Sequence, residues 1–151
     1  MNEAFAQRIL KTWFEKKGFE TYENVKINSE NRVDLIAKKG DEEWIIEVKG
    51  DYDSGTEQYN VNFDTGMGQI LKSILRQNEK TKYAICIPFS RTERGEKLSY
   101  RLILKKYSKS IVFKLLNISI ILVRDDESVE LIHPKNVSSF LNAIDPIIRA
   151  R

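Results

Sequence analysis

Residues 32–49 read RVDLIAKKGDEEWIIEVK, and this stretch decides the fold of the chain. Two strand-like runs flank Gly40-Asp41, a pair typical of a two-residue hairpin turn in which glycine takes a positive φ. If these two residues form the turn, residues at equal distances before Gly40 and after Asp41 pair with each other. That register sets Asp34 opposite Glu47.

The same register separates apolar from charged side chains. Because side chains alternate between the faces of a strand, one face collects Val33, Leu35, Ala37, Trp44, Ile46 and Val48. The other face carries Asp34 and Glu47 and sets Ile36 opposite Ile45. A slip of one residue would turn the charges toward the core, so the pattern favours this pairing.

Asp34 and Glu47 then meet across the strands at a Cβ separation of about 5 Å. Two carboxylates at that distance repel each other unless something positive joins them. Hard oxygen ligands suit Mg²⁺, which takes one or two protein carboxylates and keeps several waters. Lys49 lies on the same face, where its ammonium can approach an attacking water or a phosphate. These are the parts of a site for metal-assisted hydrolysis.

The alternative is a charged face exposed to solvent, on which Arg32 and Lys49, opposite each other in this register, screen the two acids. Ile36 and Ile45 on the same face favour the site, because a fully solvated face has little reason to hold such a pair, although single exposed apolar residues are ordinary.

The whole chain predicts the order α-β-β-β-α-β-α-β-β-α. Helices are expected at 3–17, after a polar loop at 51–60, over a basic stretch at 92–116 and at the end of the chain; strands are expected at 19–27, 31–39, 42–50, 82–88, 118–124 and 128–133. The second helix should bury one side formed by Met67, Ile70, Leu71, Ile74 and Leu75. We expect one α/β domain over residues 1–151, with a central mixed sheet and helices on both sides.

Composition narrows the class of protein. Hydrophobic residues make up 41% and charged residues 31%, as in folded globular chains. No apolar stretch approaches the roughly 20 residues of a membrane span, and the start lacks a signal-peptide pattern, so we expect no membrane contact and a cytoplasmic location. The single Cys86 reads as a core residue rather than a nucleophile, and His133 reads as structural. We expect no organic cofactor.

Charge is distributed unevenly along the chain. Residues 1–64 hold 14 acids and 9 bases, whereas residues 65–151 hold 8 acids and 16 bases. The predicted basic helix supplies the candidate DNA contacts Arg91, Arg94, Lys97, Arg101, Lys105 and Lys106. Such a patch neutralises phosphates and releases counterions. A solvated helix face is the equally open alternative.

Asp34, twelve intervening residues and Glu47-Val48-Lys49 resemble the D…(D/E)-x-K signature of the restriction-endonuclease-like superfamily, the PD-(D/E)XK nucleases. The superfamily core is α-β-β-β-α-β, which agrees with the order predicted for residues 3–88. Gly18-Phe19 and the two motif strands are most similar to archaeal Holliday-junction resolvases and Mrr-type nucleases. Val33 stands where the motif name has proline.

The resemblance implies that Asp34 and Glu47 bind Mg²⁺, for which Mn²⁺ substitutes, and that the backbone carbonyl of Val48 is a further ligand. It implies that Lys49 positions the attacking water. Family members often add a glutamate from the first helix. Glu3 is the candidate, although Gln7 occupies the resolvase-like position.

The segment Gly68-Gln69 resembles a second-helix Gly-Gln segment whose glutamine helps to hold the site or the DNA. A helical projection places Gln69 opposite the apolar side of its helix, so an exposed polar residue is equally plausible.

These observations predict a metal-dependent DNA endonuclease that uses a Mg²⁺-activated water. The alternative is a non-catalytic nuclease-like subunit that binds DNA or assembles within a restriction, repair or recombination complex. An RNA substrate is a third possibility, but no feature of the sequence indicates recognition of a 2′-hydroxyl group. Related nucleases usually act as dimers, and the apolar helix from Val137 to Ile148 either forms a homodimer interface or closes the core.

Overall fold

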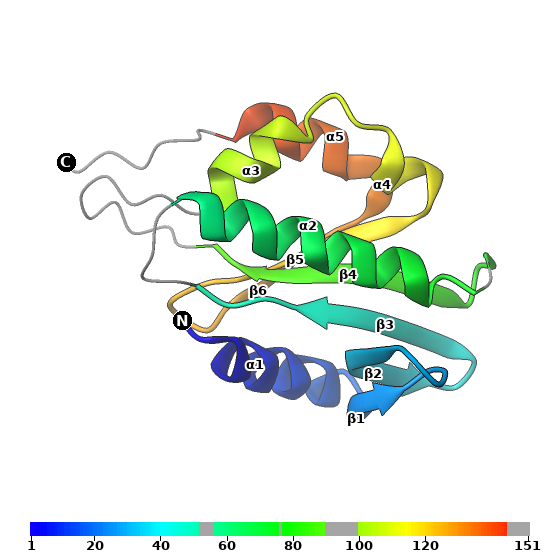
Figure 1. Ribbon diagram of the computed structural model, residues 1–151. Coiled ribbons are helices and arrows are strands. Elements are labelled where there is room, and N and C mark those ends of the chain that lie inside the picture. Colours follow the sequence, from blue (N-terminus) through cyan, green and yellow to red (C-terminus); the bar gives the residue numbers. More distant parts are fainter. Residues whose placement is uncertain (52–55, 76, 90–99, 145–151) are drawn as a thin grey trace.

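The computed structural model describes residues 1–51, 56–75, 77–89 and 100–144 (Figure 1). The elements are α1 (Glu3–Lys16), β1 (Glu20–Lys26), β2 (Arg32–Lys39), β3 (Glu42–Val48), α2 (Thr56–Ser73), β4 (Thr81–Pro88), α3 (Tyr100–Lys106), α4 (Val112–Leu115), β5 (Ile118–Val123), β6 (Val129–Ile132) and α5 (Pro134–Ala143). The predicted order is confirmed with one correction. The continuous helix at 92–116 is wrong in its described part, because α3 ends at Lys106 and α4 begins only at Val112.

The six strands form one sheet in the order β1-β2-β3-β4-β5-β6. β1, β2 and β3 are antiparallel neighbours, β3, β4 and β5 run parallel, and β6 returns antiparallel to β5. Parallel neighbours need a crossover connection. α2 makes the crossover from β3 to β4, and the stretch containing α3 and α4 makes the one from β4 to β5. The protein is therefore α/β, with a mixed open sheet flanked by helices.

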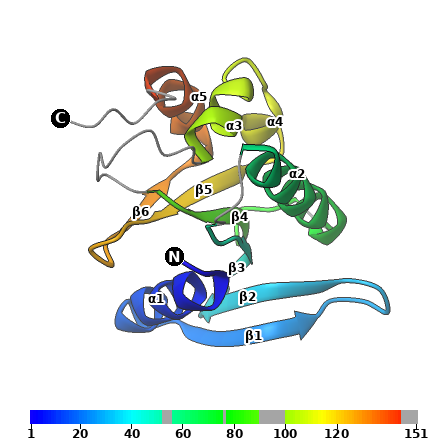
Figure 2. The ribbon, with the colours of Figure 1, turned by 60° about the vertical axis from the view of Figure 1, so that its left-hand side comes forward.

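Helices cover both faces of the sheet. Figures 1 and 2 show α1 alone on one side and α2, α3, α4 and α5 on the other. α1 forms where the sequence predicts a helix and buries Ile9, Leu10 and Phe14 against the sheet. All six residues of β5 are buried, as expected for a strand covered on both faces.

The hairpin at Gly40-Asp41 forms in the predicted register. Gly40 has a φ of 58°, and the pairs run from Lys39 with Glu42 to Leu35 with Ile46. The ladder ends there, so the predicted backbone pairing of Asp34 with Glu47, and of Arg32 with Lys49, is wrong. At this point the backbone N–H of Val48 donates instead to Oδ2 of Asp34 at 2.7 Å. Arg32 pairs with Lys26 of β1, and its guanidinium donates to the carbonyl of Asn24.

Val33 is a second correction to the hairpin. It packs with Ile36 and Ile45 in the cluster on the α2 side, not with the apolar residues beneath α1. The alternation of side chains is therefore interrupted at Asp34. The interruption coincides with Asn24 of β1, whose φ of 52° breaks the β1–β2 ladder opposite Asp34.

α2 begins earlier than expected. The predicted loop at 51–60 is wrong from Thr56 onward, while residues 52–55 lie outside the described structure. Tyr59 and Phe63 in the first turns are buried together with Met67 and Ile70. The helix therefore turns its other side outward, and the predicted burial of two leucines is wrong: Leu71 and Leu75 are 47% and 67% exposed.

The last helix closes the core. Val137 and Leu141 of α5 are buried among residues of the α2-side cluster, and residues 145–148 of the predicted helix lie outside the described structure. Cys86 is fully buried in β4, and burial raises the pKa of its thiol, as suits a core residue. Of the helices that the structure describes, none combines the length and apolar character needed to cross a membrane.

Candidate functional site

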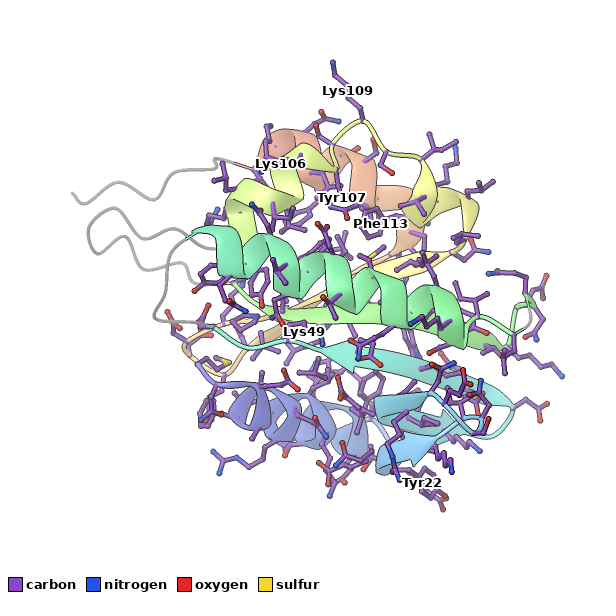
Figure 3. The ribbon with its side chains drawn as sticks, in the orientation of Figure 1. Tyr22, Lys49, Lys106, Tyr107, Lys109 and Phe113 are labelled. Atoms are coloured by element: carbon purple, nitrogen blue, oxygen red, sulfur yellow. The ribbon has the colours of Figure 1, made fainter. Side chains whose placement is uncertain are left out.

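Four of the predicted site residues meet where β3 ends. Asp34 comes from β2, Glu47 from β3, Lys49 from the residue after β3, and Gln69 from α2. Glu47 and Lys49 are 1% and 7% exposed, so both ionisable groups lie inside the protein. Figure 3 shows Lys49 beneath α2. Residues of this type are rarely buried unless they are paired or hydrogen-bonded.

The two carboxyl groups form one hydrogen-bonded pair. Burial, the charge of Asp34 and a hydrogen bond to the Asp34 side chain together raise the pKa of Glu47 to about 9. Two carboxyl groups can share a hydrogen bond only when one of them carries a proton. The pair therefore holds a proton near neutral pH, which removes the repulsion between two neighbouring negative charges.

Two hydrogen bonds fix the position of Asp34. Its Oδ2 accepts the N–H of Val48, as described above, and its carbonyl oxygen accepts a hydrogen bond from the side-chain amide of Gln7 at 3.1 Å. Gln7 also donates to the carboxylate of Glu23 at 3.2 Å. The helix-one residue at the resolvase-like position thus holds the backbone of Asp34.

The Lys49 ammonium lies between the acids and α2. Its Nζ is 3.9 Å from Oε2 of Glu47 and donates to Oε1 of Gln69 at 2.9 Å. Gln69 therefore faces the site, and the helical projection that turned it away from the buried side of its helix is wrong. The earlier start of α2 explains the error, because Tyr59 and Phe63 rotate the buried side toward Gln69.

Gly66 makes room for the lysine. A Cβ at this position would lie 2.9 Å from Cε of Lys49 and 3.0 Å from Cδ1 of Ile85. Both distances are shorter than ordinary carbon contacts, so any larger residue in this turn of α2 would displace the lysine side chain. A glycine in the middle of a helix costs stability relative to alanine, and here the missing side chain serves the site.

Glu3 joins the site through its charge. Burial raises the pKa of Glu3, the charge of Asp34 raises it further, and Lys49 lowers it. Gly50 allows this approach, because a Cβ there would lie 2.4 Å from the backbone nitrogen of Glu3. A role for Glu3 as a direct metal ligand stays a prediction.

Two further residues clamp the end of β3. Tyr100 of α3 donates its hydroxyl hydrogen to the carbonyl of Gly50 at 2.6 Å and accepts a hydrogen bond from Asn62 of α2 at 2.5 Å. Sequence reasoning missed Tyr100, Asn62, Gly50 and Gly66. Only the two glycines left a signal, one inside a helix and one directly after the motif lysine.

The described basic residues of α3 make contacts other than with the acids. Arg101 stacks over the ring of Phe89 at 4.1 Å, and Lys105 donates to the carbonyls of Leu141 and Asn142 at the end of α5. Lys106 is exposed on the α3 side of the molecule, whereas Lys49 lies beneath α2 (Figure 3). The predicted DNA contacts Arg91, Arg94 and Lys97 lie outside the described residues.

The donor set suits a small divalent cation with few protein ligands. Over residues 1–51, 56–75, 77–89 and 100–144, no three His, Cys, Asp or Glu side chains are grouped to hold a metal ion. Asp34 and Glu47 are a group of two, and Oε1 of Glu47 is buried without a hydrogen-bond partner among the described residues. Mg²⁺ commonly takes only one or two carboxylates, so these residues fit it, and a cation there would replace the shared proton.

The site has two parts. The first is a pair of acids whose shared proton a cation can replace, and the second is a buried ammonium group held at a fixed place. That combination can neutralise and orient an anionic substrate. Comparisons of this chain with models of protein families, with curated proteins and with solved structures find no match. The geometry of the site itself therefore carries the functional argument.

Proposed function

We propose that this protein is a metal-dependent DNA endonuclease in which Asp34, Glu47 and Lys49 form the active site. The single observation that carries the proposal is the pair formed by the buried carboxyl group of Glu47 and the half-buried one of Asp34, with a lysine ammonium 3.9 Å from Oε2 of Glu47. Burying an acid beside a second acid costs stability, and replacing buried charged groups by apolar ones is often neutral or stabilising. A site that binds a cation explains why the acids are there.

The order from α1 to β4 supports the finer fold proposal. It is the α-β-β-β-α-β order of the restriction-endonuclease-like core, and the sheet carries Asp34 and Glu47 on adjacent strands. We therefore propose that the fold and the signature belong together, with Lys49 two residues beyond Glu47 as the third member.

The acids supply the cation site. Asp34 and Glu47 offer hard carboxylate oxygens, and the backbone carbonyl of Val48 is the proposed further ligand, for Mg²⁺ with Mn²⁺ as a substitute. When bound, the cation lowers the pKa of a water molecule and neutralises charge on the scissile phosphate. Glu47 must give up its proton for this site to form, so cation binding releases a proton.

Lys49 supplies the fixed positive charge. Its ammonium, held by Gln69 at 2.9 Å, can donate to the attacking water or to a phosphate oxygen on which negative charge develops. Gln69 acts as a positioning residue, because it accepts one ammonium hydrogen and leaves the others for the substrate. A preorganised donor in a buried site stabilises charge more strongly than the same group in water.

The test is cleavage of supercoiled, linear, single-stranded and four-way-junction DNA with Mg²⁺, with Mn²⁺ or with EDTA. We expect cutting in either metal and none in EDTA. Asp34→Asn, Glu47→Gln and Lys49→Ala should each lower the rate by about 100-fold or more. Competition by matched RNA duplexes checks the preference for DNA, and the amount of double-strand cutting at increasing protein concentration checks whether a homodimer acts.

Asp41 and Lys80 provide matched controls. They form an exposed ion pair of 3.2 Å between the β2–β3 turn and the residue before β4, so Asp41→Asn and Lys80→Ala make the same chemical changes outside the site. Their cleavage rates should stay within about twofold of the unmodified chain, since exposed pairs contribute little. Clean protein that binds DNA without cutting it would favour the non-catalytic subunit, and full activity of Asp34→Asn would overturn the assigned site.

A further inference from the structure

A cavity lies near the start of β3, on the face of the sheet that α1 covers. The acidic site lies at the other end of β3 and on the other face. It has a volume of about 760 Å³ and is lined by Trp13, Phe14, Lys17, Phe19, Lys39, Glu42, Trp44, Lys82, Leu131 and His133. These residues come from the end of α1, from β2, β3, β4 and β6, and from the connecting residues Lys17, Phe19 and His133. The seven residues of β3 span about 20 Å, so the cavity is distant from Lys49, and no residue of the acidic site lines it.

Aromatic rings hold three ammonium groups at the wall of this cavity. The distances from Nζ to the ring centroid are 4.6 Å for Lys17 over Trp13, 5.7 Å for Lys39 over Phe19 and 5.3 Å for Lys82 over Trp44. Each lies within the range of a cation–π interaction. Lys39 also donates to the carbonyl of Lys17 at 2.8 Å, which ties the ammonium to the end of α1.

The cavity carries an excess of positive charge. Glu42 is the one acid among its lining residues, and its Oε1 accepts hydrogen bonds from Lys82 at 2.7 Å and from the Trp44 indole at 3.1 Å. The hydrogen bond from Lys82 lowers the pKa of Glu42, which keeps that carboxylate ionised. Three ammonium groups against one carboxylate leave two positive charges, which complement a phosphate monoester or two neighbouring phosphodiesters.

We propose that this cavity binds a nucleotide, with its phosphate on Lys17, Lys39 and Lys82 and its base against the half-buried rings of Trp13 and Phe19. The volume lies in the range of small-molecule sites. Lysines combined with stacking rings are the means by which proteins hold single-stranded nucleic acid without reading its sequence. A free nucleotide and a nucleotide unit of a single strand share this chemistry.

Tryptophan fluorescence reports on this cavity directly, because both tryptophans of the chain, Trp13 and Trp44, line it. The full chain is titrated in EDTA with thymidine 5′-monophosphate, a short oligothymidylate, thymidine and inorganic phosphate. We expect saturable quenching by one or both of the phosphate-and-base probes, and weaker binding as salt rises. Binding of the oligonucleotide alone identifies the source as a single strand, and binding of both identifies a free nucleotide as sufficient.

Lys17→Ala should weaken this binding by about fivefold, as expected for the loss of one ion pair. Lys16→Ala is the matched control, because Lys16 precedes it in the chain, is exposed and does not line the cavity. The dissociation constants are compared, since removing the ammonium over Trp13 also changes the starting fluorescence. No saturable quenching, equal affinity for inorganic phosphate alone, or equal weakening by the two substitutions would overturn the proposal. EDTA and the fluorescence readout make the result independent of the proposed cleavage.

Discussion

Gly66 sets the position of the Lys49 side chain. The atoms that its missing Cβ would meet, Cε of Lys49 and Cδ1 of Ile85, are the ends of flexible side chains. They can move aside, so an added methyl group would shift the ammonium more than it would destabilise the fold. Gly68, two residues further along the same helix, has nothing within 4 Å of a built Cβ.

Gly66→Ala should separate activity from stability. Alanine gains up to about 1 kcal/mol in helix propensity, which offsets the crowding, so the free energy of unfolding should change by less than about 1 kcal/mol. The cleavage rate should fall by about tenfold or more, because a displaced catalytic group loses its alignment. Urea unfolding and DNA cleavage measure the two effects.

Gly68→Ala is the control for that experiment. It should raise the free energy of unfolding by about 0.5 to 1 kcal/mol and leave cleavage unchanged, because the new methyl group meets nothing. Equal cleavage rates for Gly66→Ala and the unmodified chain would show that the position of Lys49 does not limit the reaction.

The sequence predicts which residues meet at the site better than it predicts their contacts. The turn at Gly40-Asp41 fixes the spacing that brings Asp34 and Glu47 together, and local pattern suffices for that. The roles of Gly66 and Gly50 depend on which atoms face them from other elements, and no local pattern contains that information. Asp34 is predictable only in part. The sequence predicts its strand, but the hydrogen bond from Val48 replaces the expected backbone pairing.

Among the elements, α3 has a structural role that its basic character hides. Tyr100, in its first turn, is fully buried and links α2 to the residue that follows Lys49, through Asn62 and the carbonyl of Gly50. The helix thereby holds the end of β3 in place. Lys105 and Lys106 predict a DNA-binding role for this helix, whereas the residues on its buried side support the site.

Tyr100→Phe tests this support. The substitution keeps the ring and removes the hydroxyl group, so a buried carbonyl loses its donor, and the free energy of unfolding should fall by about 1 to 2 kcal/mol. Tyr22→Phe is the control: the Tyr22 side chain is exposed and bonds only locally to Glu20, so its loss should cost less than about 0.5 kcal/mol. Equal effects in urea unfolding would contradict the proposed link.

The elements themselves were predictable where one pattern dominated. β5 is apolar except for Ser119, and α1 has a regular apolar stripe, so the sequence predicts both. The start of α2 was missed because Tyr59 and Phe63 follow an acidic, polar stretch that resembles a loop. The predicted helix at 92–116 failed at 107–111, where Ser108 and Ser110 separate α3 from α4.

At the scale of the whole molecule, the buried proton on Glu47 links stability to pH. The pKa of Glu47 is about 9 in the folded chain and near the ordinary glutamate value in the unfolded chain, so folding takes up a proton between these limits. The favourable contribution is complete below about pH 4.5 and is lost as the pH rises through about 9.

Glu47→Gln should remove that dependence. In EDTA, the unmodified chain should lose stability relative to the variant as the pH rises from about 5 to 9, by at most about 1.4 kcal/mol per pH unit. Guanidinium unfolding at several pH values measures the difference, which also cancels the titration of other groups. Parallel stability profiles for the two proteins would mean that Glu47 is ionised in the folded state.

The interruption of β1 at Asn24 bears on how copies of the molecule meet. β1 is an outer strand of the sheet, and outer strands can recruit further strands and start aggregation. The left-handed turn of the backbone at Asn24 breaks the row of hydrogen-bonding groups near its middle, and Glu20, Glu23 and Lys26 add charges on both sides of the break. The positive φ of Asn24, which interrupts the β1–β2 ladder opposite Asp34, therefore also protects this edge against unwanted strand addition.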